Sequence, residues 1–201
     1  METIKTRTQN YLYKDIVTIS EQKKSETLTK LLQALALQIG NEVSYNELAN
    51  LVGVSKQLIA KYIELLEKVY IIFKLPPFSR NLRKELSKNR KIYFYDTGIR
   101  NAIINQFNSL SLRDDAGRLW ENFVIAQRMK KDLSIGTTIN RYFWRTYDQQ
   151  EIDLIEEQKG VLHAFEIKWT SDKVKIPISW KNAYPQALWQ VINRENINQT
   201  G

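Results

Sequence analysis

The chain has 201 residues, 43% of them hydrophobic and 26% charged, and no apolar run approaches the roughly 20 residues of a membrane span, so we expect a globular, cytoplasmic protein. The absence of cysteine and the single histidine, His163, exclude disulfides, thiolate zinc sites and sites built on two histidines, so no zinc is expected. The first hundred residues carry 17 Lys and Arg against 10 Asp and Glu, which concentrates most of the net charge of +8 there and favours a polyanion such as nucleic acid as partner.

Three helices are predicted in the first third of the chain. Apolar residues recur at helical spacing over residues 27–39, and Gly40 is placed to end that helix. Ser44 and Glu47 stand at the spacing of a capping box, which predicts the start of a second helix. Ser55 is placed to cap a third helix that leaves a polar, basic face outside: Lys56, Gln57 and Lys61. This layout is typical of a helix-turn-helix whose second helix enters the major groove of DNA.

Two strand-like runs follow the third helix and favour a hairpin-shaped wing. The first, YIIFKL, ends at Pro76, and the second, KIYFYD, begins at Lys91. The connecting segment carries a dense set of basic residues suited to phosphate contacts: Arg80, Arg83, Lys84, Lys88, Arg90 and Lys91. We therefore predict a DNA-binding winged helix with little sequence specificity. Two alternatives stay open, a three-helix packing unit without a ligand and a protein-docking module.

The boundary between two domains is predicted near residue 110. Asp96 is placed to cap a short helix, and the stretch NQFNSLSLRDD after it is polar and has no regular periodicity. The expected organisation is a winged helix-turn-helix domain over residues 1–110 and an α/β domain with a central mixed sheet over residues 111–201.

The second half is expected to hold the chemistry. A helix over residues 115–131 carries Glu121, and three strand-like runs follow it: RYFWRT, EIDLIEE and VLHAFEIKWT. Because side chains alternate along a strand, Glu166 and Lys168 project from one face. If the last two strands pair through the QKG turn, Asp153 converges with them.

Two carboxylates are a common protein contribution to a Mg²⁺ site, and metal-assisted hydrolysis of a phosphodiester needs such a site. We therefore expect Asp153 and Glu166 to bind Mg²⁺ or Mn²⁺. Lys168 is expected to orient the attacking water, and Glu121 to add a further ligand or hold a water molecule. The alternative is that these residues are ordinary surface charges on an exposed sheet.

The segments GRLWENFV, EIDLI and AFEIKW resemble the E, D and ExK motifs of the PD-(D/E)xK nuclease superfamily, the fold of restriction enzymes and archaeal Holliday-junction resolvases. This resemblance implies a restriction-endonuclease-like core, with Asp153, Glu166 and Lys168 as the metal and catalytic set and Glu121 as the helix carboxylate.

Nearly the whole chain, including YLYKDIV and KIYFYDTGIRNAI, resembles the C-terminal domain of unknown function of prokaryotic AAA+ ATPases. That resemblance implies an ATPase domain of the same or a related protein as partner. The chain has no GxxxxGK[ST] loop, so we expect no ATP site in it and no ATPase motor. The leading hypothesis is a Mg²⁺-dependent endonuclease-like module. The alternatives are a non-catalytic DNA- or protein-binding scaffold and a winged-helix regulator.

Overall fold

The computed structural model describes residues 22–79, 90–135, 138–170 and 173–199, and the chain forms two compact units. Unit 1 holds Met1–Phe73 and Ile92–Arg113, and unit 2 holds Lys74–Lys91 and Asp114–Gly201. The division is not a single cut in the sequence, because the segment between Lys74 and Lys91 groups with the second half of the chain. Each unit is described by itself below.

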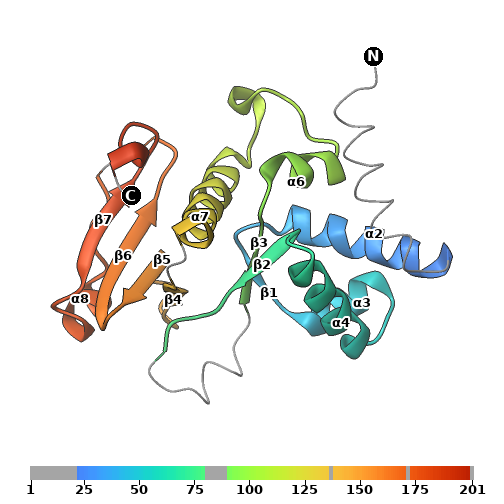
Figure 1. Cartoon of the computed structure of the whole chain (residues 1–201), viewed down its shortest axis with the longest axis horizontal. Helices are drawn as coiled ribbons and strands as arrows, with labels where there is room; N and C mark the ends of the chain where they lie inside the picture. Colours follow the sequence, from blue (N-terminus) through green and yellow to red (C-terminus); the bar gives the residue numbers. More distant parts are fainter. Residues whose placement is uncertain (1–21, 80–89, 136–137, 171–172, 200–201) are drawn as a thin grey trace. The chain divides into compact units, whose positions relative to one another are not determined.

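Unit 1 combines helices with a small sheet whose strand order is β1-β3-β2 (Figure 1). In chain order its elements are α2 (Gln22–Leu37), β1 (Glu42–Val43), α3 (Tyr45–Val52), α4 (Lys56–Lys68), β2 (Ile72–Leu75), β3 (Arg90–Phe94), α6 (Thr97–Ile103) and the 3-10 turn η1 (Leu110–Leu112). The boundary between the units falls within β2 and β3.

The predicted starts of the second and third helices are confirmed, whereas the first helix, predicted over residues 27–39, runs over Gln22–Leu37. Ser44 Oγ accepts a hydrogen bond from the Glu47 amide at 3.4 Å, and Ser55 Oγ accepts one from the Leu58 amide at 3.2 Å. Gly53 ends α3 at φ +79°, a left-handed backbone that a side chain would strain although the space beside it is open. The core between the helices is apolar, and its fully buried members include Leu31, Leu35, Ile39, Leu48, Ile59, Ile63 and Leu66.

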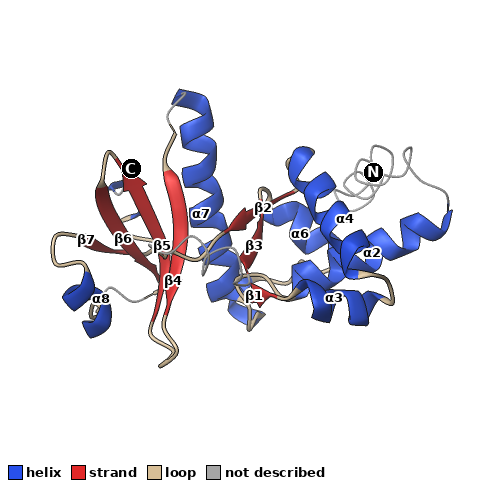
Figure 2. Ribbon diagram, turned by 90° about the horizontal axis from the view of Figure 1, so that it is seen from below, coloured by secondary structure: helices blue, strands red, loops and turns tan. Residues whose placement is uncertain are grey.

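Unit 2 is a four-stranded mixed sheet with helices on both faces, which confirms the predicted mixed sheet (Figure 2). Its elements are α7 (Ala116–Ile135), β4 (Asn140–Arg145), β5 (Glu151–Gln158), β6 (Val161–Ile167), α8 (Ile178–Ala183), β7 (Leu188–Ile192) and the 3-10 turn η2 (Ile197–Gln199). The strand order is β4-β5-β6-β7, with two antiparallel pairings and a parallel pairing of β6 with β7.

The two faces of this sheet are packed in different ways. On the α8 face, Trp180 is fully buried in an apolar cluster with Ile152, Ile155 and Ala164. On the α7 face, Arg128 and Arg141 both pair with the buried Glu156, at 2.6 and 2.8 Å. The Glu156 carboxylate would be costly to bury alone, and the two guanidinium groups satisfy both of its oxygens. Within the described part of the chain, no helix is both long and apolar enough to cross a lipid bilayer.

Candidate functional site

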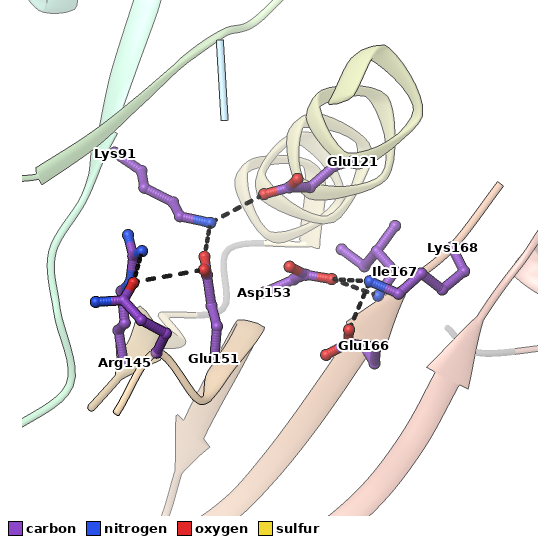
Figure 3. A network of polar contacts seen from close by, with 9 residues as sticks. Lys91, Glu121, Arg145, Glu151, Asp153, Glu166, Ile167 and Lys168 are labelled. Atoms are coloured by element: carbon purple, nitrogen blue, oxygen red, sulfur yellow. Dashed lines mark hydrogen bonds and ion pairs between the residues drawn. The ribbon is translucent and has the colours of Figure 1, made fainter. Parts of the chain in front are cut away.

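Asp153 and Glu166 lie on neighbouring strands, and both carboxylates are directed at the ammonium group of Lys168 (Figure 3). Lys168 Nζ lies 2.6 Å from Glu166 Oε1 and 4.0 Å from Asp153 Oδ2. Both carboxylate residues are 8% exposed, whereas the lysine side chain is 41% exposed. The structure therefore brings together the three residues that the sequence singled out, with two buried acids and a cation that reaches solvent.

A local irregularity of β5 positions Asp153. Tyr142 of β4 pairs with Ile155 and Trp144 pairs with Ile152, so Asp153 and Leu154 together stand opposite the single residue between Tyr142 and Trp144. Such a bulge re-aims side chains and is common beside active sites. It also breaks the strict alternation assumed from the sequence, because Ile152 and Ile155 pack into the same apolar cluster although they are three residues apart.

The Asp153 side chain also replaces part of the pairing between β5 and β6. The regular register of these strands ends at Leu154 and Phe165. One residue further on, Asp153 Oδ2 accepts a hydrogen bond from the Ile167 amide at 2.8 Å. A carboxylate that substitutes for a strand partner is held at a fixed position, so the site is built into the sheet rather than placed on a loop.

Burial disfavours the ionised form of both carboxyl groups. Burial raises the pKa of Asp153, and the charges of Lys168 and Lys91 offset only part of this effect. Burial and then the negative charge of Asp153 raise the pKa of Glu166, against the opposing hydrogen bond from Lys168. Two close acids whose ionised forms are disfavoured are typical of functional sites.

A second network beside the pair is centred on Lys91, which is 3% exposed. Its ammonium group pairs with Glu121 Oε1 at 3.4 Å and with Glu151 Oε1 (Figure 3). It also lies 5.5 Å from the ring centre of Phe143. Burial alone would lower the pKa of Lys91, but the charges of Glu121 and Glu151 outweigh it and raise the pKa well above its usual range. Lys91 therefore stays protonated and neutralises carboxylates next to the site.

The predicted helix carboxylate, Glu121, pairs with Lys91, and its negative charge also contributes to the raised pKa of Lys168. Among the described residues, no group of three or more His, Cys, Asp or Glu side chains is arranged to hold a metal ion. Any cation at the site would therefore take two protein carboxylates, Asp153 and Glu166, and complete its shell from water or substrate.

The predicted DNA-contacting residues fall into three groups. Lys56, Gln57 and Lys61 are exposed on α4, and Arg90 is partly exposed at the start of β3. Lys91 is buried and ion-paired, so it belongs to the carboxylate network and not to an exposed phosphate-binding loop. Outside the described residues lie the YLYKDIV segment and four basic positions: Arg80, Arg83, Lys84 and Lys88.

Sequence reasoning missed the role of two residues. Glu151 stands two positions before Asp153 on the same predicted strand, and that spacing was the signal that it lies near the site. Lys91 gave no such signal, because it precedes the other site residues by thirty positions or more and sits in a basic stretch. Lys91 belongs to the segment that is folded as part of unit 2, and in that unit its side chain pairs with Glu121.

Together the units define a mixed α/β protein with a buried carboxylate and lysine cluster at one end of a four-stranded sheet. The chain belongs to the family described as a domain of unknown function, DUF8612, whose model matches residues 1–110, more than half of the chain. A second domain of unknown function, DUF4143, matches residues 116–192, the part that holds Glu121, Asp153, Glu166 and Lys168.

Similar curated proteins are longer than this chain. Uncharacterized proteins of Mycobacterium tuberculosis and Mycobacterium bovis are each 28% identical over 163 residues, 80% of this chain and 36% of their own length. An uncharacterized protein of Methanocaldococcus jannaschii is 33% identical over 103 residues, 50% of this chain and 21% of its own length. The chain thus spans about a third or less of these relatives. No solved structure shows significant similarity to it.

Proposed function

We propose that unit 2 is a metal-dependent DNA endonuclease and that unit 1 binds DNA as a winged helix. The observation that carries the first part is the convergence of Asp153 and Glu166, both buried, on Lys168 at one end of the sheet. The resemblance of EIDLI and AFEIKW to nuclease motifs supports the same assignment. The proposal concerns this chain alone, which spans about a third or less of the length of these relatives.

The donor set fits Mg²⁺ or Mn²⁺ in the proposed site. Mg²⁺ is usually bound through one or two carboxylates while it keeps several waters and contacts substrate phosphate, which matches two acids without a closed cage. Asp153 and Glu166 would hold the cation. When bound, a divalent cation supplies acidification of water and relief of the negative charge that develops during phosphodiester hydrolysis.

The chain's own groups have distinct parts in this proposal. Asp153 is fixed by the Ile167 amide, so its carboxylate keeps its position through the reaction. Lys168 is partly exposed and carries a positive charge beside the acids, where it can orient water or offset charge on the phosphate. The acids raise the pKa of Lys168 against the effect of burial, which keeps it protonated.

The carboxylates do not face apart, an arrangement that would have argued against catalysis. Both lie within 4.0 Å of the same ammonium group. Their lysine partner is the motif's own Lys168, whose long, partly exposed side chain can move aside. By contrast, Glu156 is held by two arginines on the α7 face of the sheet and serves packing.

The proposed nuclease activity is tested by incubating the chain with labelled single-stranded, duplex and four-way-branched DNA in Mg²⁺, in Mn²⁺ and in EDTA. We expect cleavage only with a divalent cation, and we expect Lys168→Met to reduce its rate by about 100-fold, as for other groups that stabilise a transition state. Absence of cleavage on every DNA, with DNA binding retained, would instead favour the non-catalytic scaffold.

The proposal for unit 1 is supported by its topology. Two helices joined by a short turn are followed by β2 and β3, and these pair with β1 in the order β1-β3-β2. The second helix of the pair, α4, exposes Lys56, Gln57 and Lys61. A helix with such a face beside a hairpin suits major-groove and phosphate contacts.

Replacing Lys56 and Lys61 together by alanine is expected to weaken duplex DNA binding uniformly across sequences. The salt dependence should also flatten, by about one unit of log–log slope for each lost phosphate contact. Fluorescence anisotropy at several salt concentrations measures both effects. The matched control is Lys30→Ala together with Lys68→Ala, exposed lysines on α2 and α4 paired with Glu26 and Glu64. Equal binding by the wild type and the Lys56/Lys61 variant would contradict a DNA-reading α4.

We also propose that the module works with an AAA+ ATPase domain of the same or a related protein. The resemblance of the chain to the C-terminal domains of such ATPases supports this partner. The chain itself carries no phosphate-binding glycine loop.

A further inference from the structure

Trp169, the residue directly after Lys168, is paired with Arg194. The Arg194 guanidinium lies over the Trp169 ring, 4.4 Å from the ring centre. Arg194 Nε also donates a hydrogen bond to the Trp169 carbonyl at 3.1 Å. Trp169 is partly exposed and Arg194 is exposed, so the pair lies at the surface.

The tryptophan is fixed from two directions. The Lys168 amide donates to the Ile192 carbonyl at 2.9 Å, which joins the end of β6 to the end of its parallel neighbour β7. The Trp120 ring of α7 packs against the Trp169 ring at 5.5 Å, edge to face at 71°. In the sequence, Trp120 directly precedes Glu121 and Trp169 directly follows Lys168.

The arginine is carried by a turn that is itself held tightly. Asn193 is buried, and its Oδ1 accepts hydrogen bonds from the amides of Glu195 and Asn196 at 2.9 and 3.1 Å. Asn196 completes the turn, since its Oδ1 accepts from the Asn193 amide at 2.9 Å and its Nδ2 donates to the Val191 carbonyl at 2.8 Å. The backbone under Arg194 is therefore ordered in advance, which lowers the entropy cost of binding through its side chain.

We propose that Trp169 and Arg194 bind an unpaired nucleobase, and therefore that the nuclease substrate carries at least one unstacked nucleotide beside the cleaved phosphate. The inference that this base lies beside a cleaved phosphate rests on the proposed nuclease function, whereas the binding of the base can be tested without cleavage. Unpaired bases stack on aromatic rings and on arginine guanidinium planes, whereas bases inside a duplex hide their faces. The positive charge of Arg194 adds attraction for the adjoining phosphate.

The position of the pair supports this ligand. Trp169 and Arg194 follow the carboxyl ends of the parallel strands β6 and β7, the edge at which open α/β sheets bind ligands. Trp169 directly follows Lys168 in sequence, and the Trp120 ring that it contacts directly precedes Glu121, so the pair belongs to the same elements that carry the site residues.

The test measures binding of the full chain without cleavage, by anisotropy in EDTA. The probes are a labelled oligothymidine of about ten nucleotides, within the site sizes of such surfaces, and a blunt hairpin whose two strands are joined by an ethylene-glycol linker in place of loop nucleotides, so that it has no unpaired base. We expect Arg194→Lys, which keeps the charge but loses the planar group, to weaken oligothymidine binding about tenfold and Trp169→Leu to weaken it similarly. Hairpin binding should not change. Arg118→Lys, an exposed arginine on α7, is the matched control.

A second readout reports stacking directly. Bound oligothymidine should quench tryptophan fluorescence, and Trp169→Phe should keep binding while it removes most of that quenching. The proposal is overturned if Arg194→Lys binds oligothymidine like the wild type, or if the variants lose hairpin and oligothymidine affinity equally. Cleavage by wild type with unchanged oligothymidine binding in the variants would keep the nuclease and reject this base site. If the wild type does not cleave DNA but the variants lose oligothymidine binding as expected, the base site is supported and the nuclease activity is rejected.

Discussion

Glu166→Gln is expected to lower the rate of metal-dependent DNA cleavage by about 100- to 1,000-fold, the loss found when one group that stabilises a transition state is removed. The amide keeps the size of the carboxylate but loses its charge, so Asp153 alone would remain as an anionic ligand. Single-turnover cleavage assays at saturating DNA measure the effect. Glu157→Gln on β5 is the matched control, and we expect its rate to equal that of the wild type.

The same substitution should leave the free energy of unfolding unchanged or raise it. Burial and the charge of Asp153 raise the pKa of Glu166, so the folded chain keeps this proton to higher pH than the unfolded chain does. Stability from this group is therefore present at low pH and falls as pH rises through the interval between the ordinary and the raised pKa. Glutamine removes that loss. A strong decrease in stability would mean that Glu166 is structural and would contradict the catalytic assignment.

In contrast to Glu166→Gln, Lys91→Met is expected to lower the free energy of unfolding. We expect a loss of about 3 kcal/mol, as when one partner of a buried ion pair is removed. Glu121 and Glu151 would lose their shared cation, and their side chains are only 13% and 31% exposed. All five tryptophans belong to unit 2, so urea unfolding followed by tryptophan fluorescence reports this unit.

Two further variants show whether the cost comes from the stranded carboxylates. Lys68→Met breaks an exposed pair with Glu64 and should leave the tryptophan transition unchanged. Glu121→Gln combined with Lys91→Met should recover part of the lost stability, because one of the two unpaired charges is then gone. A Lys91→Met variant as stable as the wild type would show that the network contributes nothing to the fold.

Local signals in the sequence were sufficient for most of the elements. Ser44, Ser55 and Asp96 each accept the backbone hydrogen bonds expected of a helix start, because capping depends on residues only two or three positions apart. The alternation and turns of the second half likewise predicted β4, β5 and β6. The short helix α8 was not predicted, since its six residues carry no capping side chain and too few turns to show a period.

The site was predicted in part because its three residues lie on two consecutive strands. A hairpin brings Asp153 to Glu166 and Lys168 through local pairing alone, and the motif resemblance pointed to the same positions. The bulge at Asp153 depends on how β4 pairs with β5, which no pattern within β5 reveals. The position of Lys91 depends on long-range packing, so its basic neighbours suggested a surface role for a side chain that is buried.

Titration of Mn²⁺ into the wild-type chain, followed by calorimetry near neutral pH, tests most directly whether Asp153 and Glu166 form a divalent cation site. We expect saturable binding that weakens as the pH is lowered, because both carboxylates have raised pKa values and must be ionised to bind a metal. Glu166→Gln should weaken this binding strongly and Glu157→Gln should preserve it. Absence of saturable binding to the wild type, or equal binding to Glu166→Gln, would contradict the proposed metal site.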